Sequence, residues 1–305
     1  MGRLYSALFL LSAIWGTSFL FIKLLLTEIS PIGLVFWRCL FGAVTLLGIL
    51  LLKREKISLN RLPLVPVFFV GLFNNALPFM LISYSELIIT SSMASIINAT
   101  TPICTILIGC FFFAQKLRRE QWIGISIGFI GIIILVDFRF ADLMNQDMKG
   151  IFGMIAAAMC YGLGAQLSKR YLYNLSVTYT SFSTLAAASL ITFILLLFTK
   201  PSDLIFSYSS TAGLSLVGLG IFGSGFAYLL YYFMVKEGGP EFASIVTYIV
   251  PGMAIVWGYV LLGERVTGQM VFGLVFILSG IYLASRAKKA SSPRGMVLKK
   301  HTMRR

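Results

Sequence analysis

Polar side chains and prolines recur at helical spacing along two long apolar stretches of the chain. Four of them lie at positions 91, 95, 98 and 102, and four more lie at 240, 244, 247 and 251. Spacings of four, three and four residues place each set on one face of a helix. We expect both faces to line a path for a polar solute. The two sets are Ser91, Ser95, Asn98 and Pro102, and Pro240, Ser244, Thr247 and Pro251.

The central prolines of these faces, Pro102 and Pro251, have no amide hydrogen. Each therefore frees the carbonyl four residues earlier, at Asn98 or Thr247, and can kink its helix. In a membrane such freed groups are tolerated where they face protein or a wet cavity. This reasoning favours a solute path near the midplane. The alternative is that the prolines only shape helix packing, because proline is frequent in membrane helices.

Arg38 is a basic residue that lies well inside an apolar run, about 9 Å from its start at 1.5 Å per residue. A charge at that depth costs a few kcal/mol unless it is paired or reaches the membrane surface. We expect Arg38 to bind a solute carboxylate or to take part in gating. The alternative is that it extends to the surface or bonds helix-end carbonyls, as we expect of Lys23.

Aromatic and amide side chains complete the candidate solute path. Trp15 and Tyr161 occupy matching positions in the two halves of the chain, and Asn75 matches Ser224, which shares a helix face with Tyr228. A tyrosine ring with its hydroxyl suits amphipathic organic solutes. Gln166 can donate into the same path, or it can hydrogen-bond a neighbouring helix.

Groups that would support catalysis or metal binding are missing from the apolar runs. The single histidine, His301, lies in the tail, and the four cysteines form no CxxC pair. The acidic residues lie near the ends of the runs. The sequence therefore predicts no enzyme activity, no cofactor and no metal site.

The composition decides where the polar residues must operate. Of the 305 residues, 58% are apolar on a count that omits the 28 glycines, and 12% are charged. Soluble domains are about 45–50% apolar with glycine counted, and about 25% charged. So much apolar side chain excludes a soluble enzyme, a disordered chain and a disulfide scaffold. The sequence predicts an all-α integral membrane protein.

Ten apolar runs are long enough to cross a bilayer as helices, which takes about 20 residues each. Proline, glycine or charged clusters separate the runs, and no gap is long enough for a soluble domain. The predicted spans are 4–26, 32–52, 64–84, 90–113, 122–138, 151–168, 176–198, 212–234, 241–262 and 268–285.

The basic residues indicate the orientation of the chain. Of the 25 lysines and arginines, 19 lie on the side that holds both termini, and five lie on the other side. Because such residues collect in cytoplasmic loops, we expect cytoplasmic termini, a basic cytoplasmic tail at 286–305 and an inner-membrane location. The net charge of +14 then marks topology and predicts no nucleic-acid partner. The expected partners are a small-molecule solute and the lipid bilayer, and a homodimer is compatible with the sequence.

An internal repeat divides the chain into 4–138 and 151–285. At a spacing of 149 residues, the tripeptide at 94–96 recurs at 243–245, and one proline, three glycines and one isoleucine also recur. Each half holds five predicted spans, an odd number, so the second half enters the membrane from the opposite face. The sequence thus predicts inverted five-helix repeats, an architecture that suits alternating access.

Several motifs follow one another in a specific order along the chain. They are Trp15-Gly16-Thr17-Ser18-Phe19, Arg38, the segment from Ala94 to Pro102, Gly263-Glu264-Arg265-Val266, Gly273 and Gly280. In this order they resemble ten-helix, EamA-type members of the drug/metabolite transporter superfamily, over nearly the whole chain. The resemblance implies two five-helix repeats, a central cavity, and export of amino acids, metabolites or drugs.

The chain departs from the pattern of this family at one acidic position and from that of the small multidrug exporters at another. The family's glutamate after the fourth span is Gln115 here, whereas Glu264 keeps it after the ninth. The small multidrug exporters of the superfamily use a glutamate in their first helix, which here has none before Glu28. Proton antiport of that type is therefore not expected. Glu86 remains a candidate if the third helix extends beyond residue 84.

These observations predict a secondary transporter that exports small organic solutes by alternating access. One alternative is a carrier of the same fold for lipid-linked substrates or nucleotide sugars, which would favour a wide lateral opening or a more basic cavity. The other is a membrane scaffold without a transport cycle. Matched prolines in inverted repeats favour the transporter.

Overall fold

The computed structural model describes residues 2–54, 62–113, 119–136, 146–205, 208–231, 233–234, 237 and 246–289. Within these ranges the chain forms helices and no strand. Seven helices are long and apolar enough to cross a membrane, and three shorter apolar helical segments lie at 122–131, 249–262 and 268–280. This architecture agrees with the predicted class of helical membrane protein.

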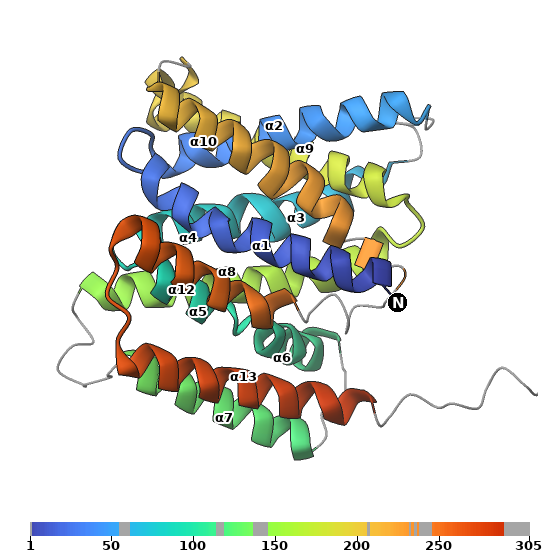
Figure 1. Cartoon of the computed structure of the whole chain (residues 1–305). Coiled ribbons are helices and arrows are strands. Elements are labelled where there is room, and N and C mark those ends of the chain that lie inside the picture. Colours follow the sequence, from blue (N-terminus) through green and yellow to red (C-terminus); the bar gives the residue numbers. More distant parts are fainter. Residues whose placement is uncertain are drawn as a thin grey trace, which may run out of the picture.

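The long helices lie roughly side by side in layers, with α7 and α13 together at one edge (Figure 1). The first elements are α1 (Gly2–Leu25), α2 (Pro31–Leu52), α3 (Leu64–Gly71), η2 (Leu72–Ala76), α4 (Leu77–Glu86), α5 (Ser91–Asn98), α6 (Thr101–Phe113) and α7 (Arg119–Val136). The remaining elements are α8 (Gln146–Tyr171), α9 (Val177–Thr199), η4 (Pro201–Leu204), α10 (Ser210–Gly220), η5 (Ile221–Phe226), α12 (Val246–Leu262) and α13 (Gly268–Lys289).

The third apolar run is longer than predicted. Elements α3, η2 and α4 form one helical span from Leu64 to Glu86, whereas the sequence predicted an end at residue 84. The next helix, α5, starts with Thr90 as its N-cap, whose hydroxyl accepts a hydrogen bond from the Met93 amide at 3.2 Å. Glu86 therefore lies inside the helix, and it is completely buried.

The matched prolines have different effects on their helices. Helix α5 ends at Asn98 and α6 begins at Thr101, so the fourth run is interrupted just before Pro102. The Thr101 hydroxyl donates to the freed Asn98 carbonyl at 2.7 Å, which compensates for the missing amide. In contrast, α12 continues as a helix through Pro251. The predicted effect of a proline on its helix is seen as an interruption before Pro102, whereas a kink of the continuous helix α12 at Pro251 stays a prediction.

Two π-helical turns lie at equivalent positions of the chain. They are η2 and η5, and their first residues are 149 positions apart. Each has a local cause, because Pro78 follows η2 and supplies no amide to Asn74, while η5 contains Gly223 and Gly225. Such turns free main-chain groups and are frequent at functional sites.

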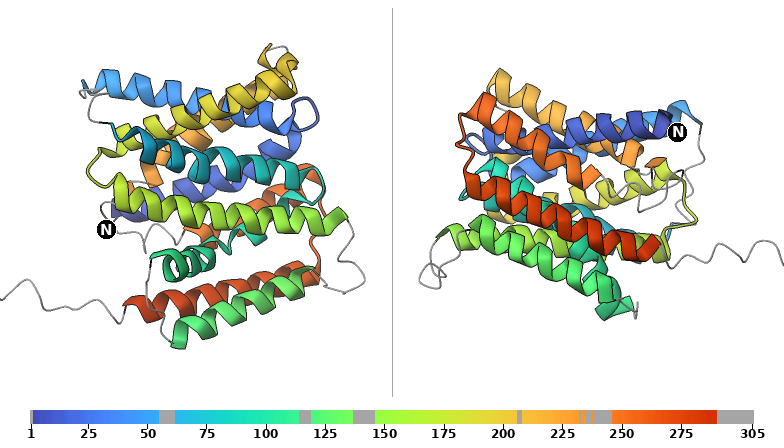
Figure 2. Two further views of the ribbon diagram at one scale, coloured as in Figure 1. Left: turned by 180° about the vertical axis from the view of Figure 1, so that it is seen from behind. Right: turned by 60° about the horizontal axis from the view of Figure 1, so that its bottom comes forward.

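The helices pack in pairs that join distant parts of the chain. Helix α2 packs against α9, α1 against α12, and α8 against both α4 and α6. Helices α7 and α13 lie side by side in both views of Figure 2. Glycines allow this close approach, since a β-carbon on Gly280 would collide with the main chain of Gly124 and Gly128.

Candidate solute-binding cavity

A cavity of about 280 Å³ lies among the helices, with walls from α1, α2, η2, α4, α5, α6, α8, α12 and the segment at 228–231. Most of its lining is apolar or aromatic, as in sites for small organic ligands. Eight of the residues that the sequence singled out line it together: Trp15, Arg38, Ser95, Asn98, Pro102, Tyr161, Tyr228 and Pro251.

The other four sequence-predicted residues have different positions. Asn75 is fully buried and contacts the cavity residue Tyr228, and Gln166 is half-buried on α8 but is not among the lining residues. Ser244 lies outside the described residues, and so does the side chain of Thr247. Whether these residues contribute to solute handling stays a prediction.

Arg38 directs its charge into the cavity. Only 5% of the residue is exposed, which contradicts the alternative that it reaches the membrane surface. Its Nε donates to the Ser224 hydroxyl at 2.9 Å, and its guanidinium carbon lies 3.9 Å from the centre of the Phe79 ring. Among the described lining residues there is no carboxylate to neutralise it. The cavity therefore holds a fixed positive charge beside an aromatic face.

Main-chain carbonyls of both π-helical turns accept hydrogen bonds from residues that line the cavity, and η2 also contributes Asn74 to the lining. The Tyr228 hydroxyl donates to the Asn75 side-chain oxygen and lies 3.4 Å from the Asn74 carbonyl. On the other side, Trp15 donates its indole N–H to the Gly223 carbonyl at 3.2 Å. The rings of Trp15 and Tyr228 lie edge to face, 6.5 Å apart. The two turns thus hold the aromatic walls in place.

Helix α5 supplies two polar groups of different character. Ser95 donates its hydroxyl to the Ser92 carbonyl at 2.8 Å, a bond within its own helix. Asn98 borders the cavity, and its side-chain oxygen is buried without a hydrogen-bond partner among the described residues. A buried acceptor of this kind costs free energy until a donor arrives, so Asn98 is suited to receive a hydrogen bond from a solute.

Three carboxylates each bind the start of a helix at one end of the molecule. This end lies opposite the N-terminus of the chain (Figure 1). We call this the distal end; it contains segments 26–30, 87–90, 200–205 and 263–267. The Glu264 carboxylate accepts four hydrogen bonds, from the amides and hydroxyls of Ser91 and Ser92, at 2.5–3.1 Å. Burial raises the pKa of Glu264, but the bonds from these serines outweigh it and leave the pKa below its ordinary value.

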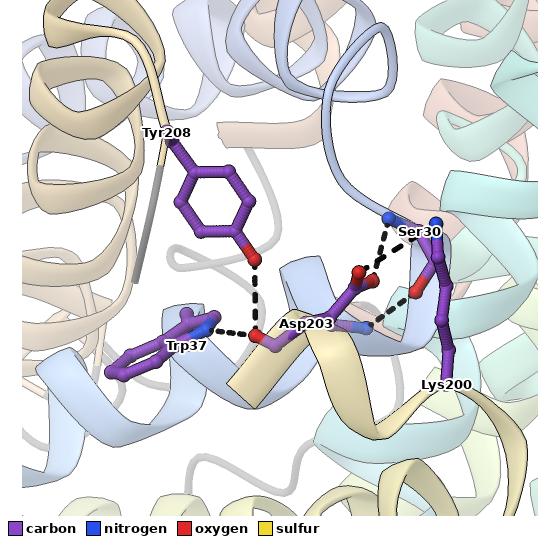
Figure 3. Close-up of polar contacts among 6 residues, drawn as sticks. Ser30, Trp37, Lys200, Asp203 and Tyr208 are labelled. Carbon is purple, nitrogen blue, oxygen red and sulfur yellow. Dashed lines mark hydrogen bonds and ion pairs between the residues drawn. The ribbon is translucent and has the colours of Figure 1, made fainter. Parts of the chain in front are cut away.

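Asp203 makes a similar contact with the start of α2 (Figure 3). Its carboxylate accepts from the Ser30 amide at 3.0 Å and lies 3.6 Å from the Lys200 amine. Its main-chain carbonyl accepts from the Trp37 indole at 2.9 Å and from the Tyr208 hydroxyl at 3.0 Å. Burial, followed by the charge of Asp203, raises the pKa of Tyr208 to about 12. One residue thereby ties η4 to α2.

Glu28 completes the set by capping α10. Its carboxylate accepts from the Ser209 hydroxyl at 2.6 Å and from the Ser209 amide at 2.9 Å. These bonds hold the pKa of Glu28 below its ordinary value. All three carboxylates contact helix N-termini that are more than 170 residues away in the sequence. Each contact is favourable because the N-terminus of a helix carries a partial positive charge. The sequence contains serines at the start of each of these helices, but it does not show which carboxylate each serine would contact.

Comparison with known proteins identifies the family. The profile of the EamA-like transporter family matches the chain twice, over residues 3–137 and 148–286. The chain belongs to this family. It is therefore an integral membrane protein of a transporter family, and the cavity is its candidate solute site.

Individual relatives are similar along most of their length. The chain is 26% identical over 276 residues to an uncharacterized transporter of Archaeoglobus fulgidus, which covers 90% of this chain and 95% of that protein. It is 26% identical over 291 residues to the uncharacterized inner membrane transporter YedA of Escherichia coli K12, with 92% of each covered. A crystal structure at 17% identity has a TM-score of 0.69, covers 96% of this chain and all of that one, and supports the fold alone.

Proposed function

We propose that this protein is an inner-membrane secondary transporter that exports small organic solutes, such as amino acids, metabolites or drugs, by alternating access. Its ten helices would form inverted five-helix repeats over 4–138 and 151–285, with both termini in the cytoplasm. The observation that carries this proposal is the cavity, which is lined by helices of both matched regions and contains one buried arginine.

The pairing of helices supports the inverted repeat. Helices with the same rank in the two halves are counterparts: α2 and α9 are the second runs, and α7 and α13 are the fifth. Each of these two pairs packs together. The contact of α1 with α12 has its equivalent in the contact of α8 with α6. Matching π-helical turns at a spacing of 149 residues give the same relation. Two such halves can exchange conformations, which is the basis of alternating access.

The cavity chemistry favours solutes that carry a carboxylate and an apolar part. Arg38 offers a charged donor, Asn98 offers a neutral acceptor, and aromatic rings surround both. Guanidinium groups bind carboxylates well because their donors match both oxygens. An amino acid has the charge and size for such a site. A nucleotide sugar, with two phosphates, would need more positive charge than Arg38 supplies.

The carboxylate contacts at the distal end support a cycle with a closed gate. Glu28, Asp203 and Glu264 each join one matched region to the other. Separating the two regions at this end would break all three contacts. We therefore interpret this structure as a state closed at the distal end, which would face away from the cytoplasm.

An export assay in cells tests the proposed function. The gene is expressed in a bacterial strain that lacks its own exporters, and growth is measured with toxic amino acids, amino-acid analogues and drugs. We expect greater resistance to at least one compound, with lower accumulation inside the cells. Unchanged growth and accumulation for every compound, with the protein present in the membrane, would count against the proposal.

A further inference from the structure

Glu86 is a buried carboxylic acid without the contacts that usually accompany such a group. The residue has no exposed surface. Neither side-chain oxygen has a hydrogen-bond partner among the described residues. This contrasts with Glu28, Asp203 and Glu264, whose carboxylates all accept hydrogen bonds.

Burial and the helix end both oppose a negative charge on Glu86. An isolated carboxylate removed from water is costly, so such groups usually take up a proton. Glu86 is also the last residue of α4, where the partial negative charge of the helix terminus adds to the cost.

Charged neighbours have opposite effects on the ionisation of Glu86. Lys23 of α1 and Arg38 of α2 favour the carboxylate, whereas Glu264, which follows α12, opposes it. The Lys23 amine donates to the main-chain carbonyls of Glu86 and Ile89, the latter at 3.0 Å. Lys23 thus holds the segment between α4 and α5. Its amine bonds the Glu86 main chain and forms no hydrogen bond with the Glu86 carboxyl group.

The position of Glu86 connects the cavity with the distal end. Ile82, one helical turn earlier on α4, lines the cavity, as does Ile22 beside Lys23. In the other direction, Ser91 and Ser92 follow the segment that Lys23 holds, and Glu264 caps them. Glu86 therefore lies between the solute cavity and the contacts that close the distal end.

We propose that Glu86 is a proton-binding site that couples transport to the proton gradient. The inference rests on the proposed function. When the distal end is open, a proton from that side binds one carboxylate oxygen and gives a neutral acid. When the distal end is closed, the acid returns the proton to water on the cytoplasmic side, and the oxygen keeps the bonding electron pair.

Lys23 links the proton to the gate. While Glu86 is protonated, the Lys23 amine remains on the main-chain carbonyls of Glu86 and Ile89, as in this structure. Loss of the proton creates a carboxylate beside the amine, which attracts it away from these carbonyls. The segment before α5 is then released, and with it Ser91 and Ser92. Proton release in the closed state thereby prepares the next opening of the distal end.

Infrared spectroscopy can detect this proton without a transported solute. The purified full-length protein in lipid nanodiscs is titrated with acid and base, and the carbonyl stretch of protonated carboxylic acids is recorded. We expect such a band at neutral pH that disappears as the pH rises. The band should be absent from Glu86→Gln and retained in Asp203→Asn, the matched variant of another buried acid.

Two results of this titration would overturn the proposal. A wild-type protein without the band at neutral pH would mean that Glu86 is ionised and permanently paired. A band that persists to the most alkaline pH at which the protein stays folded would mean that the acid never exchanges its proton. Both results come from the wild-type protein and stand even if Glu86→Gln fails to fold.

Transport in proteoliposomes separates the coupling from the proposed function. A pH difference of one unit supports about tenfold accumulation of a solute exchanged for one proton, since each unit is worth about 1.4 kcal/mol. For an amino acid that the cell assay identifies, we expect this accumulation in the wild type and only downhill movement in Glu86→Gln. Transport that ignores the pH gradient would refute the coupling alone, whereas absence of any transport would refute the proposed function.

Discussion

Arg38 illustrates how a single residue acquires a role that its type alone does not specify. Ser224 and Phe79 hold the guanidinium from two sides, and Ser224 belongs to the π-helical turn η5. The sequence identified Arg38 as unusual but left a surface position open. Its orientation could not be predicted because Ser224 is 186 residues away. That contact exists only after α2 and η5 have packed together.

Substitution of Arg38 tests its role in recognising the solute. Replacing it with glutamine removes a charge-assisted hydrogen bond worth about 1.5–3 kcal/mol, so transport of carboxylate-bearing solutes should fall about tenfold or more. Solutes without a carboxylate should be much less affected. The measurement is initial efflux from proteoliposomes for paired acids and amides, with Arg38→Lys as the variant that keeps the charge.

An equal loss for every solute would contradict a recognition role for Arg38. A structural role would have that signature, and thermal unfolding of the purified variant distinguishes the two. A midpoint close to that of the wild type, together with a selective loss, supports recognition.

Glu264 gives the distal end a dependence on pH that can be derived from its contacts. Folding lowers the pKa of this carboxyl below its ordinary value of 4.5. Its contribution to stability is therefore present above that value and is lost as the pH falls through the folded-state pKa. Glu264→Gln should lower the free energy of unfolding at pH 7 by about 1–3 kcal/mol. Thermal unfolding in nanodiscs between pH 7 and pH 3 measures this.

The pH series contains its own check. On acidification the wild-type midpoint should fall towards that of Glu264→Gln, because protonation removes the same charge as the substitution. If the difference between the two proteins stays constant down to pH 3, the serine contacts do not depend on the carboxylate charge, and the interpretation is wrong.

At the scale of elements, the apolar runs were predictable and their internal irregularities were not. Run lengths follow from bilayer thickness, so most helix positions agree with the sequence within a few residues. The π-helical turns had only weak signals, namely Pro78 and two glycines in η5. Pro102 and Pro251 also differ, because α12 stays helical through Pro251 whereas the fourth run is interrupted before Pro102. Whether a helix stays regular at such positions depends on its neighbours, which can supply hydrogen bonds to the main-chain carbonyls that lack a donor.

Helix contacts at this scale predict a sharp difference between two glycines. Gly280→Ala places a β-carbon against the main chain of α7, whereas nothing lies within 4 Å of the equivalent atom on Gly218. Overpacking of this kind costs about 1–3 kcal/mol. Gly280→Ala should therefore lower the unfolding midpoint, and Gly218→Ala should leave it unchanged or raise it slightly.

Differential scanning fluorimetry of both purified variants checks this comparison. A Gly280→Ala protein as stable as Gly218→Ala would show that α7 and α13 do not approach as closely as described. It would also weaken the paired arrangement on which the proposed repeat depends.

At the scale of the whole molecule, the polar residues to which we assign roles lie in two functional layers. One is the cavity, which Arg38 and Asn98 line. The other is the distal end, where three carboxylates join regions distant in sequence, and Glu86 lies between the layers. The sequence predicted much of the first layer, since spacing and depth marked its members. It did not predict the second, because those contacts depend on how the two matched regions meet.

Efflux from proteoliposomes tests the central claim most directly. Vesicles containing the purified wild-type protein are loaded with radiolabelled amino acids, one at a time, and release is compared with that from empty vesicles and from vesicles with Arg38→Gln. We predict that the wild type releases at least one carboxylate-bearing solute faster than empty vesicles, and that Arg38→Gln loses most of this release. Equal release from all three vesicle types, for every solute, would contradict the claim that this cavity carries a transported solute.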